Sequence, residues 1–89
     1  MEKELHILIL EDVATDAKLM ELELGRANVS FLSKRVETRE DFIRELHDFA
    51  PDLILSDYRL PSFDGSEALT IVTKESPDIP LYFSYRSTR

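Results

Sequence analysis

The sequence contains no cysteine and no long hydrophobic run, and its basic residues are fewer than its acidic ones. The lack of cysteine excludes disulfides, thiolate catalysis and zinc sites built from thiolates. No apolar segment approaches the roughly 20 residues that a membrane-spanning helix needs, and the first four residues lack the basic start of a signal peptide. We therefore expect a cytoplasmic protein with no membrane partner.

The shortage of positive charge argues against nucleic-acid binding. Eleven basic residues stand against eighteen acidic ones, which gives a formal net charge of -7. A surface of that sign repels phosphate backbones and anionic lipid headgroups. The two histidines, His6 and His47, are too far apart in the sequence to share one helix face as paired metal ligands.

The remaining composition is that of a small folded domain. Hydrophobic residues make up 43% of the chain and charged residues 33%, an ordinary balance for a globular protein. With 89 residues there is room for one domain, residues 1–89. We expect a thin stability margin, because a short chain buries a small fraction of its surface.

Hydrophobic periodicity predicts strands that alternate with helices. Two apolar runs, residues 5–10 and 53–56, are typical of strands that helices cover on both faces. The more polar segment 31–36 predicts a strand at a sheet edge, and residues 81–85 predict a fourth strand. Short connections between strands and helices imply a parallel sheet with right-handed crossovers, which places the chain in the α/β class.

Three amphipathic helices are predicted between these strands. Apolar residues recur at three- and four-residue intervals over 15–26, from the Thr38–Asp41 capping pair to Pro51, and over 66–75. Asn28 is typical of a helix exit. The residues expected to face the core are Ala17, Met20, Leu24 and Ala27 in the first helix, Phe42, Ile43, Leu46, Phe49 and Ala50 in the second, and Ala68, Leu69 and Val72 in the third.

Three acidic residues lie at the ends of two buried strands. Glu11 and Asp12 directly follow the first strand, and Asp57 closes the third. Ligands bind beyond the carboxyl ends of strands in open parallel sheets, so these side chains should converge if the two strands are neighbours. Like charges so close favour a bound cation, and oxygen ligands are those that Mg²⁺ prefers. We therefore predict a magnesium site, in which Asp57 is the best-placed nucleophile toward a phosphoryl group.

Three motifs in the sequence resemble the receiver domains of response regulators and hybrid histidine kinases. They are Ile9-Leu10-Glu11-Asp12, Asp57-Tyr58-Arg59-Leu60-Pro61 and Asp64-Gly65, and the resemblance covers roughly residues 5–83. It implies the flavodoxin-like (CheY-like) fold with strand order 2-1-3-4-5, and a histidine kinase or phosphotransfer protein as partner. It also implies that Asp57 is the phosphoacceptor, that Asp12 and Asp57 give carboxylates to Mg²⁺, that Glu11 supports the metal through water, and that the backbone carbonyl of Arg59 is a further ligand.

The end of the sequence departs from the receiver pattern. Receivers place a Ser or Thr at the end of the fourth strand and a Lys at the end of a fifth. Here the hydroxyl position falls on Tyr85, next to Ser84, and no lysine follows. We therefore expect a receiver truncated after the fourth strand, with Ser84 as the candidate switch hydroxyl and with impaired phosphoryl transfer. The exposed edge of the fourth strand should make the chain a homo-oligomer, by edge pairing or by exchange of elements between chains.

The sequence leaves two alternative functions open. The first is an interaction or assembly module that is not phosphorylated and self-associates through the edge of the fourth strand. The second is a phosphatase with an aspartyl nucleophile, which usually shows Asp-x-Asp and would need an acid in place of Arg59. No enzyme activity is expected beyond Mg²⁺-dependent self-phosphorylation and dephosphorylation.

Overall fold

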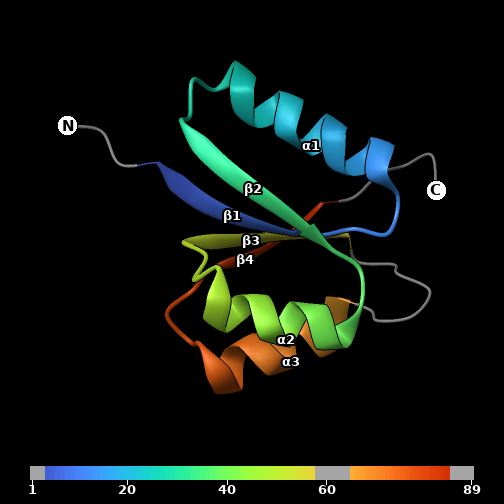
Figure 1. The fold of residues 1–89 in the computed structure, drawn as a ribbon, viewed down its shortest axis with the longest axis vertical. Helices are drawn as coiled ribbons and strands as arrows, with labels where there is room; N and C mark the ends of the chain where they lie inside the picture. The colour runs from blue at the N-terminus through green and yellow to red at the C-terminus, as the bar shows by residue number, and fades with distance from the viewer. Residues whose placement is uncertain (1–3, 58–64, 85–89) are drawn as a thin grey trace.

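The computed structural model describes residues 4–57 and 65–84, which form one parallel sheet and three helices (Figure 1). The strand order is β2-β1-β3-β4, which confirms the flavodoxin-like arrangement predicted from the sequence. None of the described helices is long and apolar enough to cross a membrane. The elements in chain order are β1 (Leu5–Leu10), α1 (Ala14–Arg26), β2 (Phe31–Val36), α2 (Arg39–Asp48), β3 (Leu53–Asp57), α3 (Gly65–Glu75) and β4 (Leu81–Ser84).

β1 is an inner strand of the sheet, and helices cover both of its faces. Ile7, Leu8, Ile9 and Leu10 are each 0% exposed. Leu8 and Leu10 belong to a core cluster with residues of α2 and α3, whereas Ile7 and Ile9 belong to a second cluster with residues of α1. Figure 1 shows the same division, with α1 alone on one face and α2 and α3 on the other. Because successive side chains point to opposite faces, both sets must be apolar.

Two local signals at helix ends are confirmed. The hydroxyl oxygen of Thr38 accepts a hydrogen bond from the backbone N–H of Asp41 at 3.1 Å, so this capping pair starts α2. Asn28 follows α1 with a φ of 61°, a left-handed conformation that Asn tolerates well. Ala50 follows α2 with a φ of 51°, which no sequence signal predicted and which costs about 1–2 kcal/mol for a residue with a Cβ.

Three of the residues expected in the core lie on the surface. Leu69 is 45% exposed, because Ala68 and Val72 define the inward face of α3 and Leu69 lies about 100° further round the helix than Ala68. Ala27 and Ala50 are exposed because α1 and α2 end before them. The prediction for Leu69 was wrong because it placed the residue on the wrong face of the helix. The predictions for Ala27 and Ala50 were wrong because they extended the helical periodicity past the true helix ends.

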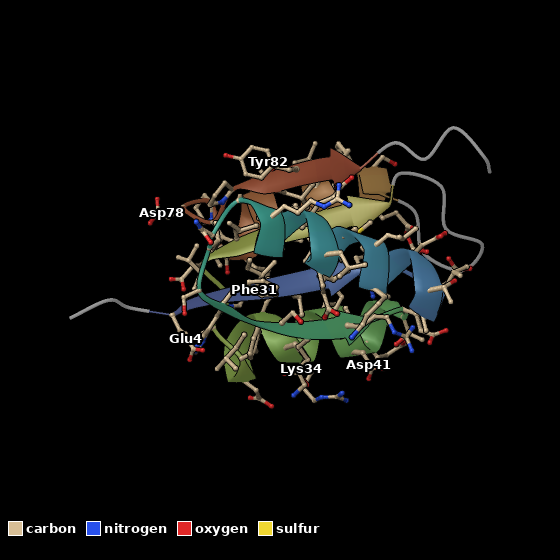
Figure 2. The ribbon with its side chains drawn as sticks, turned by 90° about the horizontal axis from the view of Figure 1, so that it is seen from above. Glu4, Phe31, Lys34, Asp41, Asp78 and Tyr82 are labelled. Atoms are coloured by element: carbon tan, nitrogen blue, oxygen red, sulfur yellow. The ribbon has the colours of Figure 1, made fainter. Side chains whose placement is uncertain are left out.

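The two edge strands of the described sheet differ in charge. β2 carries Lys34 and Arg35, and charged side chains of this kind protect a sheet edge from pairing with other chains. β4 carries no charged residue, and within the described residues it pairs with β3 alone. Tyr82 of β4 is 57% exposed and lies on the side of the sheet seen in Figure 2.

Candidate functional site

The strand register brings the predicted acidic residues to one edge of the sheet. Leu10 of β1 lies opposite Ser56 of β3, so the next residues on these neighbouring strands are Glu11 and Asp57. The backbone N–H of Glu11 donates to the carbonyl of Val36 at 3.0 Å, which extends the β1–β2 pairing as far as Glu11. The backbone register therefore brings Glu11 and Asp57 to the same edge of the sheet, and the convergence of their side chains with that of Asp12 stays a prediction.

The side chain of Glu11 is turned into the protein. It is 0% exposed, and its Oε2 accepts a hydrogen bond from the backbone N–H of Val13 at 3.0 Å. Asp12, between these two residues, is half-buried. The loop that leaves β1 is thus closed by its own first side chain, and Asp12 is the acid of this pair that reaches toward the surface.

The loop is also held by a basic residue that the sequence analysis did not select. Nη1 of Arg35 donates to the backbone carbonyl of Glu11 at 3.1 Å and lies 3.0 Å from Oε2 of Glu37. Arg35 lies opposite Ile9 in the β1–β2 register. A parallel pairing of the two predicted strands could have indicated this contact, because a residue near the end of β2 then lies beside the end of β1.

For several predicted site residues the structure describes only the backbone, or does not describe the residue. The backbones of Asp57 and Ser84 are placed, as Cα partners in the β3–β4 pairing, but their side chains are not described. Arg59 and Tyr85 lie outside the described residues. Among the side chains that are described, no three from His, Cys, Asp or Glu form a group that could hold a metal ion. The predicted metal site therefore depends on Asp57 and on the segment after it.

The donor set at this edge fits a hard divalent cation. Asp12 is a half-buried acid directly after β1, and Asp57 is an acid that follows the last β1–β3 partners on the neighbouring strand, whereas the carboxylate of Glu11 is buried and accepts from the backbone of Val13. Mg²⁺ binds oxygen ligands, usually one or two carboxylates together with waters. Softer metals prefer thiolate or imidazole ligands, and this chain has no cysteine.

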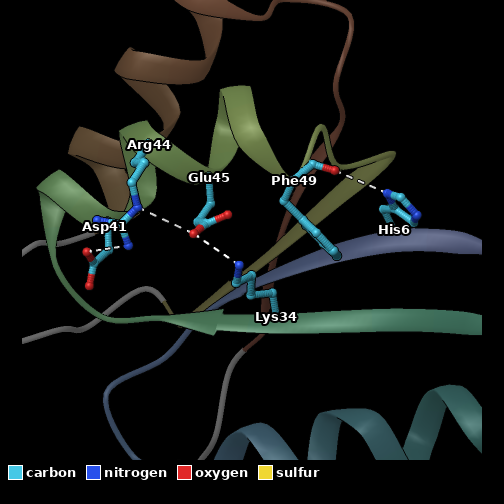
Figure 3. Close-up of polar contacts among 6 residues, drawn as sticks. All are labelled: His6, Lys34, Asp41, Arg44, Glu45 and Phe49. Carbon is cyan, nitrogen blue, oxygen red and sulfur yellow. Dashed lines mark hydrogen bonds and ion pairs between the residues drawn. The ribbon is translucent and has the colours of Figure 1, made fainter.

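A second polar cluster among the described residues lies between α2 and the sheet (Figure 3). Glu45 is 5% exposed, and its Oε2 lies 3.2 Å from Nζ of Lys34 and 3.5 Å from Nε of Arg44. Arg44 also lies 2.8 Å from Oδ1 of Asp41, which raises the pKa of its guanidinium above the usual value through charge attraction. The Lys34–Glu45 pair joins α2 to β2, the two pairs of Arg44 lie within α2, and none of the three includes the acidic loop after β1.

His6 lies in the same region and not at the acidic site. Its ring stacks on Phe49 with centroids 4.8 Å apart, and its Nδ1 lies 3.1 Å from the Phe49 carbonyl oxygen. His47 is exposed, 3.9 Å from Glu75. The two histidines therefore contact different partners, as their separation in the sequence indicated.

No protein-family model matches the chain, but curated relatives do. The chain is 37% identical over 75 residues to the luminescence regulatory protein LuxO of Vibrio campbellii. It is 26% identical over 76 residues to the DNA-binding transcriptional regulator NtrC of Proteus hauseri. These matches cover 84% and 85% of this chain, whereas the chain spans 16% of the length of each relative.

Solved structures have the same fold. A crystal structure of a Chloroflexus aurantiacus protein assigned as a response regulator matches with a TM-score of 0.77 at 25% identity, over 91% of this chain and 66% of that one. The anti-anti-sigma factor PhyR from Bartonella quintana matches with a TM-score of 0.73 at 23% identity, over 93% of this chain and 34% of that one, and shows the fold alone. The chain is therefore homologous to the receiver domain of response regulators such as LuxO and NtrC, and it has the receiver fold.

Proposed function

We propose that the chain is the phospho-accepting module of a two-component phosphorelay, with Asp57 as the acceptor. The donor would be the phosphohistidine of a histidine kinase or of a phosphotransfer protein, in the cytoplasm. The observation that carries the proposal is the register of β1 and β3, which puts the acidic pair Glu11–Asp12 and Asp57 at the same edge of the sheet. Receiver homology supports it independently.

The proposed chemistry is a transfer between two nucleophiles. One carboxylate oxygen of Asp57 forms a bond to phosphorus, while the phosphorus–nitrogen bond to the donor imidazole breaks. The leaving imidazole keeps the electron pair of that bond and takes up a proton. Hydrolysis of the resulting acyl phosphate by water restores the Asp57 carboxylate and releases inorganic phosphate. The chain would thus act as a signalling module whose catalysis is limited to self-phosphorylation and self-dephosphorylation.

Each residue of the acidic edge has a separate task in this proposal. Asp12 and Asp57 would hold Mg²⁺ with the backbone carbonyl of Arg59, and Glu11 would support the site through water. When bound, Mg²⁺ neutralises charge on the transferring oxygens and aligns them. Ser84, whose Cα pairs with that of Asp57, is the candidate hydroxyl donor to the phosphoryl oxygens.

The test is incubation of the chain with a small phosphodonor and Mg²⁺, followed by intact-mass measurement. We expect one phosphoryl group per chain, stable in acid and labile in base, which is lost in Asp57→Asn and retained in Asp48→Asn. The second substitution makes the same chemical change at an exposed position at the end of α2. A wild-type chain that gains no mass would contradict the proposal.

Self-association through β4 is the second candidate function. It is favoured by the uncharged sequence of β4, which contrasts with Lys34 and Arg35 on the opposite edge strand. The exposed ring of Tyr82 supplies apolar area on this strand. In this candidate the 89-residue chain forms a discrete oligomer that is indifferent to Mg²⁺ and to phosphodonor.

A further inference from the structure

We infer that Arg35 is a positioning residue for Asp12, acting with the side chain of Glu11 as a two-sided clamp on the backbone of the acidic loop. The inference deepens the proposed function and rests on it, because it concerns the carboxylate that would bind Mg²⁺. It assigns to a residue of β2 a part in a site formed by β1 and β3.

The clamp follows from the two peptide units that flank Asp12. The carbonyl of Glu11 and the N–H of Asp12 belong to one planar unit, and Arg35 donates to that carbonyl at 3.1 Å. The carbonyl of Asp12 and the N–H of Val13 belong to the next unit, and Oε2 of Glu11 accepts from that N–H at 3.0 Å. Both units are therefore anchored by side chains, which restricts the two backbone dihedrals of Asp12 that aim its carboxylate.

Arg35 is itself held in place. Its Nη1 contacts Glu37 at 3.0 Å as well as the Glu11 carbonyl, so one nitrogen bridges the end of β2 and the loop after β1. The backbone N–H of Glu11 is anchored to Val36, the residue after Arg35. The guanidinium of Arg35 carries several N–H donors in a planar, fixed arrangement, so one group can contact both acceptors.

A fixed Asp12 matters because Mg²⁺ tolerates little distortion. The ion demands near-octahedral geometry with short metal–oxygen distances. A ligand that is ordered before binding avoids the entropy cost of being ordered by the ion. Loss of outer residues that orient a ligand typically lowers metal affinity by about 10–100-fold.

The experiment compares Arg35→Met, which has similar length but no donor and no charge, with Arg35→Lys, which keeps a donor and the charge. Arg26→Ala is the matched charge control, because Arg26 is exposed in the last turn of α1. The first readout is the ¹⁵N order parameter of the Asp12 and Val13 amides without metal. The second is the Mg²⁺ dissociation constant from calorimetry.

We expect Arg35→Met to lower the order parameters from about 0.85 toward 0.6 and to raise the Mg²⁺ dissociation constant about tenfold. Arg35→Lys should recover most of both losses, and Arg26→Ala should change neither. Unchanged order parameters, or unchanged or tighter Mg²⁺ binding in Arg35→Met, would overturn the inference while leaving the proposed function intact. A wild-type chain that binds no Mg²⁺ would instead overturn the proposed function and the inference with it.

Discussion

Leu10 lies opposite Ser56 in the parallel pairing of β1 and β3. These two buried residues are the last partners of that pairing, and an acid follows each of them in the sequence. Residues far apart in the chain thereby reach the same edge of the sheet. The position of the proposed site thus follows from the register, which is in turn specified by the apolar faces of β1 that must each meet a helix.

Removing the charge of Asp12 should weaken Mg²⁺ binding. Asp12→Asn leaves an amide oxygen in place of the carboxylate, so we expect the dissociation constant to rise at least about tenfold, equal to about 1.4 kcal/mol. Isothermal titration calorimetry measures it. Asp48→Asn, which makes the same change at an exposed position on α2, should leave the affinity within about twofold of wild type. Equal affinities for the two variants would rule out Asp12 as a ligand.

For the ion pair of Lys34 and Glu45, we predict that one substitution lowers the stability of the protein and that a second substitution restores it. Oε2 of Glu45 has both basic partners, and its buried Oε1 has no hydrogen-bond partner among the described residues. Lys34→Met should therefore lower the free energy of unfolding by about 1–2 kcal/mol, less than for a fully buried pair because the Lys34 side chain is 50% exposed.

The double substitution Lys34→Met with Glu45→Met provides the control. It replaces the buried carboxylate by an apolar side chain of similar size, and the free energy of unfolding should return to within about 1 kcal/mol of wild type. Urea unfolding followed by circular dichroism measures both values. A double variant that is no more stable than Lys34→Met would contradict this interpretation of the cluster.

The corrected face of α3 can be tested with one substitution at two positions. Leu46→Ala should cost about 2–5 kcal/mol, because Leu46 is 4% exposed and packs in the cluster beneath α2 and α3. Leu69→Ala should stay within about 0.5 kcal/mol of wild type, since Leu69 is 45% exposed and alanine favours helices. Urea midpoints compare the two directly, and similar losses would place Leu69 back in the core.

Periodicity and end signals were enough to predict the strands and most of the helices. Residues 5–10 and 31–36 were expected as strands with the bounds that β1 and β2 have. The pair Thr38–Asp41 located the start of α2, because an N-cap hydroxyl accepts a hydrogen bond from a backbone N–H of the first turn. Asn28 marked the end of α1 through its tolerance of a positive φ.

Charged residues with long side chains were the part that periodicity could not predict. Glu45 and Leu46 follow Phe42 by three and four residues, so all three occupy inward positions of α2. The burial of Glu45 depends on Lys34, a residue of β2. Arg35 reaches the acidic loop only because β2 lies beside β1. Such contacts depend on tertiary geometry, which composition and spacing within one element do not contain.

Self-association should depend on the β4 edge. Tyr82→Lys places a charge on β4, so we expect the dissociation constant of an oligomer to rise at least about tenfold, or about 1.4 kcal/mol. Leu32→Lys is the control, because Leu32 is 49% exposed on β2, an edge that already carries charge. Sedimentation velocity over a concentration series measures both. A monomeric wild-type chain at every concentration would exclude the assembly function.

The most direct test of the central claim is to locate the phosphoryl group on the chain. The wild-type protein is incubated with a small phosphodonor and Mg²⁺, reduced with borohydride, which converts an acyl phosphate to an alcohol, and mapped by peptide mass spectrometry. The account predicts a reduced side chain at Asp57, absent without Mg²⁺ and absent in Asp57→Asn. Reduction at Glu11 or Asp12 instead, or no reduced residue in the wild-type chain, would contradict it.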